Sequence, residues 1–166
     1  MTEGLREEIA ALVPRLRRFA YALCGNRDEG DDVVQNACLK ALTRLDQYQP
    51  GTRLDSWMFR IVHTGFLDEA RRRVRRATVP DPDAVARASD GGRAARRPQH
   101  RLQLDRVLQA MAALPEDQRA VLALVAIEGC SYRKTAETLD IPVGTVMSRL
   151  ARARAKLMPL HAEGDA

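Results

Sequence analysis

The sequence has few aromatic residues, few cysteines and no long apolar run. Phe, Trp and Tyr make up 4% of the 166 residues although 45% of the chain is hydrophobic, so the core must be built mainly from Ala, Leu and Val. Because no run of about 18 apolar residues is present and the N-terminal MTEGLREEIA is too polar for a signal peptide, we expect a cytoplasmic protein without membrane insertion. Patterns typical of β-strands are almost absent.

The residue types needed for catalysis or metal binding are also scarce. Cys24, Cys38 and Cys130 stand far apart, and none belongs to a CxxC pair or a Cys/His cluster. This spacing predicts reduced, mostly buried cysteines and no metal site. The chain also lacks a phosphate-binding glycine loop and any recognisable pair of nucleophile and base. We therefore expect neither an enzyme nor a cofactor.

Apolar residues recur at intervals of three and four along nearly the whole chain, which predicts an all-α protein. The first four helices are expected to cover about residues 5–12, 14–25, 29–46 and 55–76. Pro14 is expected to open the second helix and Asp28 to cap the third, whose inner face would carry Val33, Ala37, Ala41 and Leu45. From 77 to about 101 the periodicity is lost, because Pro, Gly, Ala and Arg cannot form an apolar face.

The C-terminal half returns to helical spacing at Leu104 and is interrupted at Leu114-Pro115 and again at Gly129. Ser131 is expected to cap a short helix that ends at Leu139. Asp140 would then turn the chain, since Asp tolerates the left-handed conformation better than most residues. Pro142 suits the first turn of a last helix over about 142–158. Two helices joined by so tight a turn predict a helix-turn-helix.

A helical wheel at about 100° per residue gives this last helix two distinct sides. The predicted buried stripe consists of Val146, Leu150, Ala153 and Leu157, and the short outer side chains are Ser148, Ala151 and Ala155. Thr145, Arg149, Arg152 and Lys156 lie on one flank, and Met147 and Arg154 on the other. Residues 141–158 contain no acidic residue, so the helix suits the major groove of DNA. The alternative is a surface helix with a solvated basic face.

The last helices carry the string SYRKTAETLDIPVGTVMSRLARARAKL, preceded by LPEDQRAVLALVAIEG. This string resembles region 4 of the extracytoplasmic-function sigma factors of bacterial RNA polymerase. DDVVQN followed by LKA resembles region 2.2, and WMFRI with LD and the tract RRRVRR resembles regions 2.3 and 2.4. The resemblance implies region 2 over 1–76, a flexible linker over 77–103, region 4 over 104–160 and a tail over 161–166. It covers roughly residues 5–76 and 104–160.

The resemblance also implies a role for each part. The β′ clamp helices of core RNA polymerase would be bound by Asp32, Gln35, Asn36 and Lys40, although this region taken alone would favour an ordinary capped and charged helix face. The −10 element of promoter DNA would be bound by Arg60, His63, Thr64 and Arg71. The −35 element would be bound by Thr145, Ser148, Arg149, Arg152, Arg154 and Lys156. The β flap of polymerase and an anti-sigma factor are the other expected partners.

The fourth helix supports the −10 interpretation on physical grounds. A wheel that takes Trp57 as its zero gathers Leu54, Ile61 and Gly65 as core. It places the two cations, the histidine and the hydroxyl of the −10 set on one flank, where they suit phosphates and an unstacked base. Trp57 itself is predicted to be core rather than a stacking platform.

Two other classes of protein fit part of the sequence. A sigma mimic that titrates an anti-sigma factor would resemble region 2, but such decoys tend to lose the basic DNA-facing positions and usually carry a receiver domain. A stand-alone helix-turn-helix repressor leaves the region 2 motifs unexplained. Binding to core polymerase separates both from a sigma factor.

Overall fold

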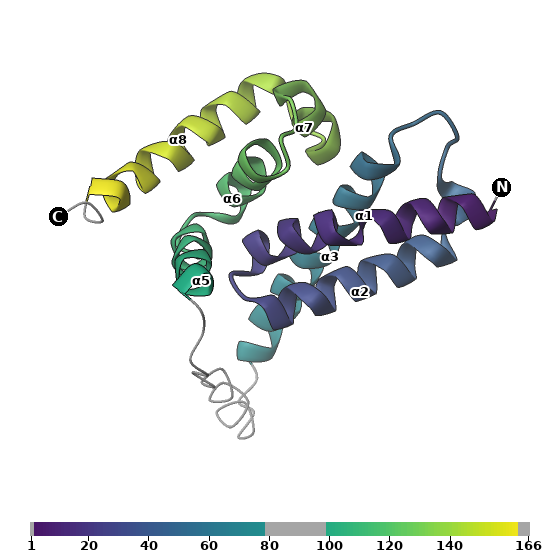
Figure 1. Cartoon of the computed structure of the whole chain (residues 1–166), viewed down its shortest axis with the longest axis horizontal. Helices are drawn as coiled ribbons and strands as arrows, with labels where there is room; N and C mark the ends of the chain where they lie inside the picture. The colour runs from purple at the N-terminus through teal and green to yellow at the C-terminus, as the bar shows by residue number, and fades with distance from the viewer. Residues whose placement is uncertain (1, 79–98, 163–166) are drawn as a thin grey trace.

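The computed structural model describes residues 2–78 and 99–162, and every regular element in these two ranges is helical. The N-terminal bundle consists of α1 (Thr2–Cys24), α2 (Arg27–Thr43) and α3 (Leu54–Ala77), with the 3₁₀ turn η1 (Leu45–Gln47) between α2 and α3. Each of the three long helices packs against the other two (Figure 1). The all-α prediction is confirmed for the described residues.

The core of the N-terminal bundle lies where these three helices meet. Phe19 of α1 and Phe59 of α3 are fully buried, and their rings meet edge to face with centroids 5.3 Å apart. Met58 and Val62 extend the buried side of α3, and the other buried side chains come mainly from α1 and α2. Edge-to-face aromatic pairs contribute beyond their buried area, so two of the few aromatic residues anchor the contact between the first and third helices.

Pro14 does not open a second helix, and the prediction of two N-terminal helices is wrong. It lies inside the continuous helix α1 on the exposed side. An internal proline removes one backbone hydrogen bond and weakens a helix. Here the helix continues because Ile9, before the proline, and Leu16, after it, are both buried in the same core. Tertiary packing outweighs the local preference.

The start of α2 also differs from the prediction. Asn26, not Asp28, is the N-cap, and its side-chain oxygen accepts a hydrogen bond from the Glu29 backbone N–H at 2.8 Å. Val33, Ala37 and Ala41 are buried as predicted. Leu45 lies beyond the end of α2, in η1, so the helix is shorter than the predicted 29–46.

The C-terminal half contains α5 (Gln99–Ala112), α6 (Glu116–Leu122), the π-helical turn η2 (Ala123–Ile127), α7 (Tyr132–Leu139) and α8 (Val143–Ala162). Ser131 caps α7 as predicted, and α8 follows after a short turn. Figure 1 shows α8 along the side of the molecule farthest from α2. Among the described residues no helix is both long and apolar enough to cross a membrane.

The two halves pack against each other. α1 contacts α5, α6 and η2, while α3 contacts α7, and the buried apolar residues of both halves form one continuous cluster. Gly25, at φ +76°, fits this contact closely, because a Cβ there would lie 2.9 Å from the Ala112 Cβ. The two domains therefore share an interface in this structure.

The predicted linker, 77–103, overlaps helices at both ends. Ala77 ends α3, and residues from Gln99 onward belong to α5. The rest of the predicted linker, 79–98, and residues 163–166 of the predicted tail lie outside the described residues. The domain boundaries stay predictions.

Candidate nucleic-acid interface

The C-terminal half builds a helix-turn-helix from α7 and α8. The Ser131 hydroxyl accepts a hydrogen bond from the Lys134 backbone N–H at 3.0 Å, which fixes the start of α7. Asp140 ends the helix in the left-handed conformation at φ 55°, as its tolerance for this region predicts. The Ile141 N–H then donates to the Ala136 carbonyl at 3.0 Å, which closes the turn.

The wheel prediction for α8 is confirmed in its main features. Val146, Leu150 and Ala153 are buried, and Leu157 packs partly against them. The opposite side is exposed, and it carries Ser148, Ala151, Arg152, Arg154, Ala155 and Lys156. Within residues 2–78 and 99–162, none of these exposed cations lies in an ion pair. Short side chains flanked by cations can enter a DNA groove and reach phosphates or base edges.

Two of the predicted −35 residues are less accessible. Thr145 is half-buried. The Arg149 Nε lies 3.4 Å from an Asp117 carboxylate oxygen on α6, and its side chain is 27% exposed. Arg149 therefore faces the body of the domain, and an ion pair with Asp117 competes with any phosphate.

The predicted core of α3 is wrong in part. Leu54 is buried, but Ile61 is only half-buried and Gly65 adds no side chain to the core. Met58, Phe59 and Val62 form the side that packs on α1 and α2. Trp57, predicted to be core, is half-buried: it packs against the buried cluster and lies beside Tyr48, with ring centroids 5.3 Å apart.

The predicted −10 residues lie on the side of α3 that approaches α7 and α8. Although Arg60 is exposed overall, its guanidinium donates hydrogen bonds to the carbonyls of Glu137 and Thr138 at the end of α7. His63 is half-buried, and burial together with the nearby positive charge of Arg149 lowers its pKa below the ordinary value. The structure therefore brings one −35 candidate and two −10 candidates to the same interface.

The other two members of the −10 set remain exposed. The Thr64 hydroxyl donates to the Arg60 backbone carbonyl at 2.8 Å. Arg71 lies near the Asp68 carboxylate on the same helix, 3.9 Å away, with a side chain that is 70% exposed. A pair this open contributes little, so both side chains are available to a ligand.

A hollow of about 600 Å³ lies beside the start of α3, and sequence reasoning missed it. The loop before α3 and the first turns of α3 form most of its wall, and Glu137 of α7 completes it. The residues that line it are Gln47, Gln49, Gly51, Thr52, Arg53, Ser56, Trp57, Arg60 and Glu137. Tyr48 braces the loop, because its hydroxyl donates to the Thr52 carbonyl at 2.6 Å. The sequence signal that could have indicated this hollow is Tyr48, an aromatic residue two positions before Pro50-Gly51.

All four predicted polymerase-binding residues line one groove of about 440 Å³ between α2 and α3. Asp32, Gln35, Asn36 and Lys40 come from α2, and Asp68 and Arg72 of α3 are among the residues opposite them. Leu39, on the same side of α2, is 57% exposed. The groove therefore gathers the four predicted residues on one surface.

Two stretches of the chain match known families. Residues 104–157 match the family described as sigma-70, region 4. Residues 9–63 match the family described as the sigma2 domain of PhyR. Each match covers one half of the helical structure.

Curated relatives extend the similarity over nearly the whole chain. The ECF RNA polymerase sigma factor EcfG of Rhodopseudomonas palustris is 40% identical over 163 residues, which cover 96% of this chain and 86% of the relative. The ECF RNA polymerase sigma factor SigE of Mycolicibacterium smegmatis is 35% identical over 86% of this chain and 56% of the relative.

Solved structures agree with the arrangement of both halves. The sigma factor RpoE of Bartonella quintana, solved in complex with the anti-sigma factor NepR, matches with a TM-score of 0.79 and 30% identity over 99% of both chains. CnrH in complex with the cytosolic domain of CnrY matches with a TM-score of 0.73 and 27% identity over 100% of this chain and 92% of CnrH.

Proposed function

The chain belongs to the extracytoplasmic-function RNA polymerase sigma factors, and from this membership we propose how its surfaces divide the work of promoter-specific transcription initiation. The observation that carries the proposal is the outward face of α8, where Arg152, Arg154 and Lys156 stand among short side chains at the end of a helix-turn-helix. This face binds the −35 element as duplex DNA. Phosphate contacts supply affinity, and base-edge contacts supply sequence preference.

On α8 the two kinds of contact fall to different residues. Arg152 lies one turn beyond Ser148 on the outer face and reaches a base edge. Lys156 and Arg149 hold phosphates, the latter after leaving Asp117. Arg154 reaches the backbone from the opposite flank, and Thr145 contributes at the start of the helix.

The −10 element is bound by the exposed side of α3 and by the hollow before it. Arg60, His63 and Arg71 supply positive charge or donors for phosphates, and Thr64 supplies a hydroxyl. The hollow beside Trp57 is large enough for an unstacked base, and its polar rim offers partners for a base edge.

Core polymerase is bound through two separate surfaces. The groove between α2 and α3, with Asp32, Gln35, Asn36 and Lys40, binds the β′ clamp helices. The β flap binds region 4, for which the structure offers an apolar groove of about 340 Å³ between α5, α6, η2 and α8. Val107, Met111, Leu122 and Leu157 are among its lining residues. An apolar groove of this kind suits an amphipathic helix.

Regulation by an anti-sigma factor follows from the same family. RpoE of Bartonella quintana and CnrH, both similar to this chain over nearly their whole length, were solved with the anti-sigma factor NepR and with the cytosolic domain of CnrY, respectively. We propose that an anti-sigma factor binds this chain. We also propose that the chain itself acts in the cytoplasm and has no enzymatic activity.

One observation favours a second function, that of a sigma mimic. Residues 9–63 match the sigma2 domain of PhyR, and the anti-anti-sigma factor PhyR of Bartonella quintana, solved with NepR, shares the fold with a TM-score of 0.60 at 15% identity. The region 4 match over 104–157 and the cations of α8 weigh against a mimic.

Run-off transcription with purified core polymerase separates the two functions. A sigma factor binds core and starts transcription at one site upstream of its own gene, whereas a mimic binds an anti-sigma factor and supports no transcript. The variant Arg152→Ala/Arg154→Ala is the matched control, because it retains the α2 groove and should bind core but lose initiation. Failure of the wild-type chain to bind core contradicts the sigma function.

A further inference from the structure

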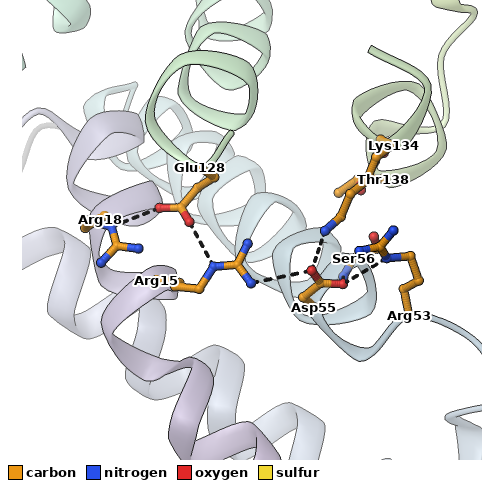
Figure 2. Close-up of polar contacts among 8 residues, drawn as sticks. All are labelled: Arg15, Arg18, Arg53, Asp55, Ser56, Glu128, Lys134 and Thr138. Atoms are coloured by element: carbon orange, nitrogen blue, oxygen red, sulfur yellow. Dashed lines mark hydrogen bonds and ion pairs between the residues drawn. The ribbon is translucent and has the colours of Figure 1, made fainter. Parts of the chain in front are cut away.

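We propose that a relay of five charged side chains closes the two domains on each other in the free protein, and that this closed state masks the −10 face. The charges alternate in sign along the relay, which runs in the order Arg18, Glu128, Arg15, Asp55 and Lys134 (Figure 2). Its masking role rests on the proposed function of α3, whereas the closure itself rests on contacts alone.

Every pair in the relay except Arg15–Asp55 joins one domain to the other. Glu128, at the end of η2, accepts from Arg15 at 3.1 Å and from Arg18 at 3.2 Å, both on α1. Arg15 also lies 3.5 Å from Asp55 at the start of α3. Lys134 of α7 donates to the same Asp55 carboxylate. Region 4 thus supplies one anion and one cation, and region 2 supplies their partners.

Three members of the relay are largely shielded from water. The side chain of Glu128 is 1% exposed, that of Lys134 11% and that of Asp55 15%. Burial raises the pKa of Asp55, but the hydrogen bond and charge of Lys134 outweigh it, so the pKa lies below its ordinary value. A buried charge that loses its partner is strongly unfavourable. The relay therefore holds the domains together only while all of its members are paired.

The closed state occupies the surface that the proposed function requires. The Arg60 guanidinium donates its hydrogen bonds to the Glu137 and Thr138 carbonyls at the end of α7. Glu137 of α7 completes the wall of the hollow beside Trp57. His63 is held close to Arg149. Arg60 and His63 become free for DNA only when α7 and α8 move away, so α3 offers the complete −10 set only in an open state.

Charge reversal within the relay tests the closure. Lys134→Glu places a second carboxylate beside Asp55, and Glu128→Lys places a third cation beside Arg15 and Arg18. Glu is favourable in the first turn of a helix, so Lys134→Glu should leave α7 folded. Arg133→Glu is the matched control, because it makes the same charge change one residue away on a side chain that is 86% exposed. The double variant Lys134→Glu/Glu128→Lys retains the wild-type net charge.

Two measurements on the free, full-length protein report opening. X-ray scattering gives the radius of gyration, and acrylamide quenching gives the accessibility of Trp57, which is the only tryptophan of the chain and lines the hollow next to Glu137. We expect both values to rise in Lys134→Glu, Glu128→Lys and the double variant, and to stay at the wild-type level in Arg133→Glu. If the relay variants, folded by circular dichroism, match the wild type in both measurements, the closure is refuted.

Run-off transcription tests the masking. If the open state is a minor population, variants that favour it should need roughly three- to tenfold less sigma for half-maximal transcription. A rise in potency is diagnostic, since loss of a cation from the helix-turn-helix alone would weaken DNA binding. Opened variants with wild-type potency would overturn the masking. Failure of every variant and of the wild type to bind core would overturn the proposed function instead, while scattering still decides the closure.

Discussion

The two helices proposed to bind promoter DNA, α3 and α8, differ in how far their polar faces are exposed to solvent. α8 packs through small aliphatic side chains and leaves its basic outer face open to solvent, whereas α3 packs on α1 and α2 with one side and meets α7 with another. A helix with one neighbouring layer keeps its functional face free, but a helix between two layers does not. We infer that the −35 face of α8 is accessible in the closed protein, whereas Arg60 and His63 of the −10 set are engaged at the interface.

The buried sides of the two helices should differ most in stability. Phe59→Ala removes a fully buried ring that meets Phe19 and lies 5.2 Å beneath the Arg15 guanidinium, so it should lower the free energy of unfolding by about 3–5 kcal/mol. Val146→Ala on α8 removes fewer buried atoms and should cost less. Urea unfolding followed by circular dichroism measures both, and a larger loss for Val146→Ala would reverse the comparison.

On the outer face of α8, Arg152→Ala should have the next largest effect. We expect a loss of about 1–3 kcal/mol in −35 binding and a relaxed preference at one or two adjacent base pairs, because a base-edge contact is lost. The measurement is holoenzyme binding to a panel of −35 variants. An equal loss on every variant would make Arg152 a phosphate contact.

Lys156→Ala should have a smaller and more uniform effect. It should weaken all −35 variants about equally and lower the slope of log affinity against log salt by about one, since one phosphate contact is lost. Titration of the same promoter panel across several salt concentrations gives both quantities. Selective loss on some sequences would show that Lys156 reads bases.

Mild acid should open the α3 interface without affecting the face of α8. The closed state lowers the pKa of His63, so an open state binds the proton more readily as the pH falls below about 6.5. Closure is therefore fully favoured above that pH and loses stability as the pH falls through the lowered pKa. Asp55, whose pKa is also lowered, adds to this loss only below about pH 4.

Acrylamide quenching of Trp57 between pH 7.5 and 5.5 measures this opening, which we expect to be the smallest of the four effects. His63→Gln is the control and should remove the pH-dependent step. If the step persists in that variant, another group on the interface titrates, and the assignment to His63 is wrong.

Local sequence was enough for α7 and α8 because their constraints are local. The Ser131 cap, the left-handed Asp140 and the stripe through Val146, Leu150 and Ala153 each depend on residues within a few turns. The same reasoning found the inner face of α2 through Val33 and Ala37. The four α2 residues that line one groove were named from the family resemblance, not from spacing.

Local sequence failed where a distant contact decided the outcome. Pro14 is kept inside α1 because residues on both sides of it are buried in one core. The wheel for α3 placed the core around Leu54, Ile61 and Gly65, whereas contact with α1 and α2 buries Met58, Phe59 and Val62. The spacing of apolar residues along α3 does not predict which of its polar sides the second domain will cover.

The sequence by itself determined the helical class, the helix-turn-helix and the cations of its second helix, since spacing and turn chemistry act over a few residues. Only the tertiary structure decided that Arg60 and His63 face region 4 and that Asp55, Glu128 and Lys134 complete a relay between the domains. The partners in that relay stand between 79 and 113 positions apart along the chain where they cross from one domain to the other. Charges so distant meet only through packing of the helices that carry them.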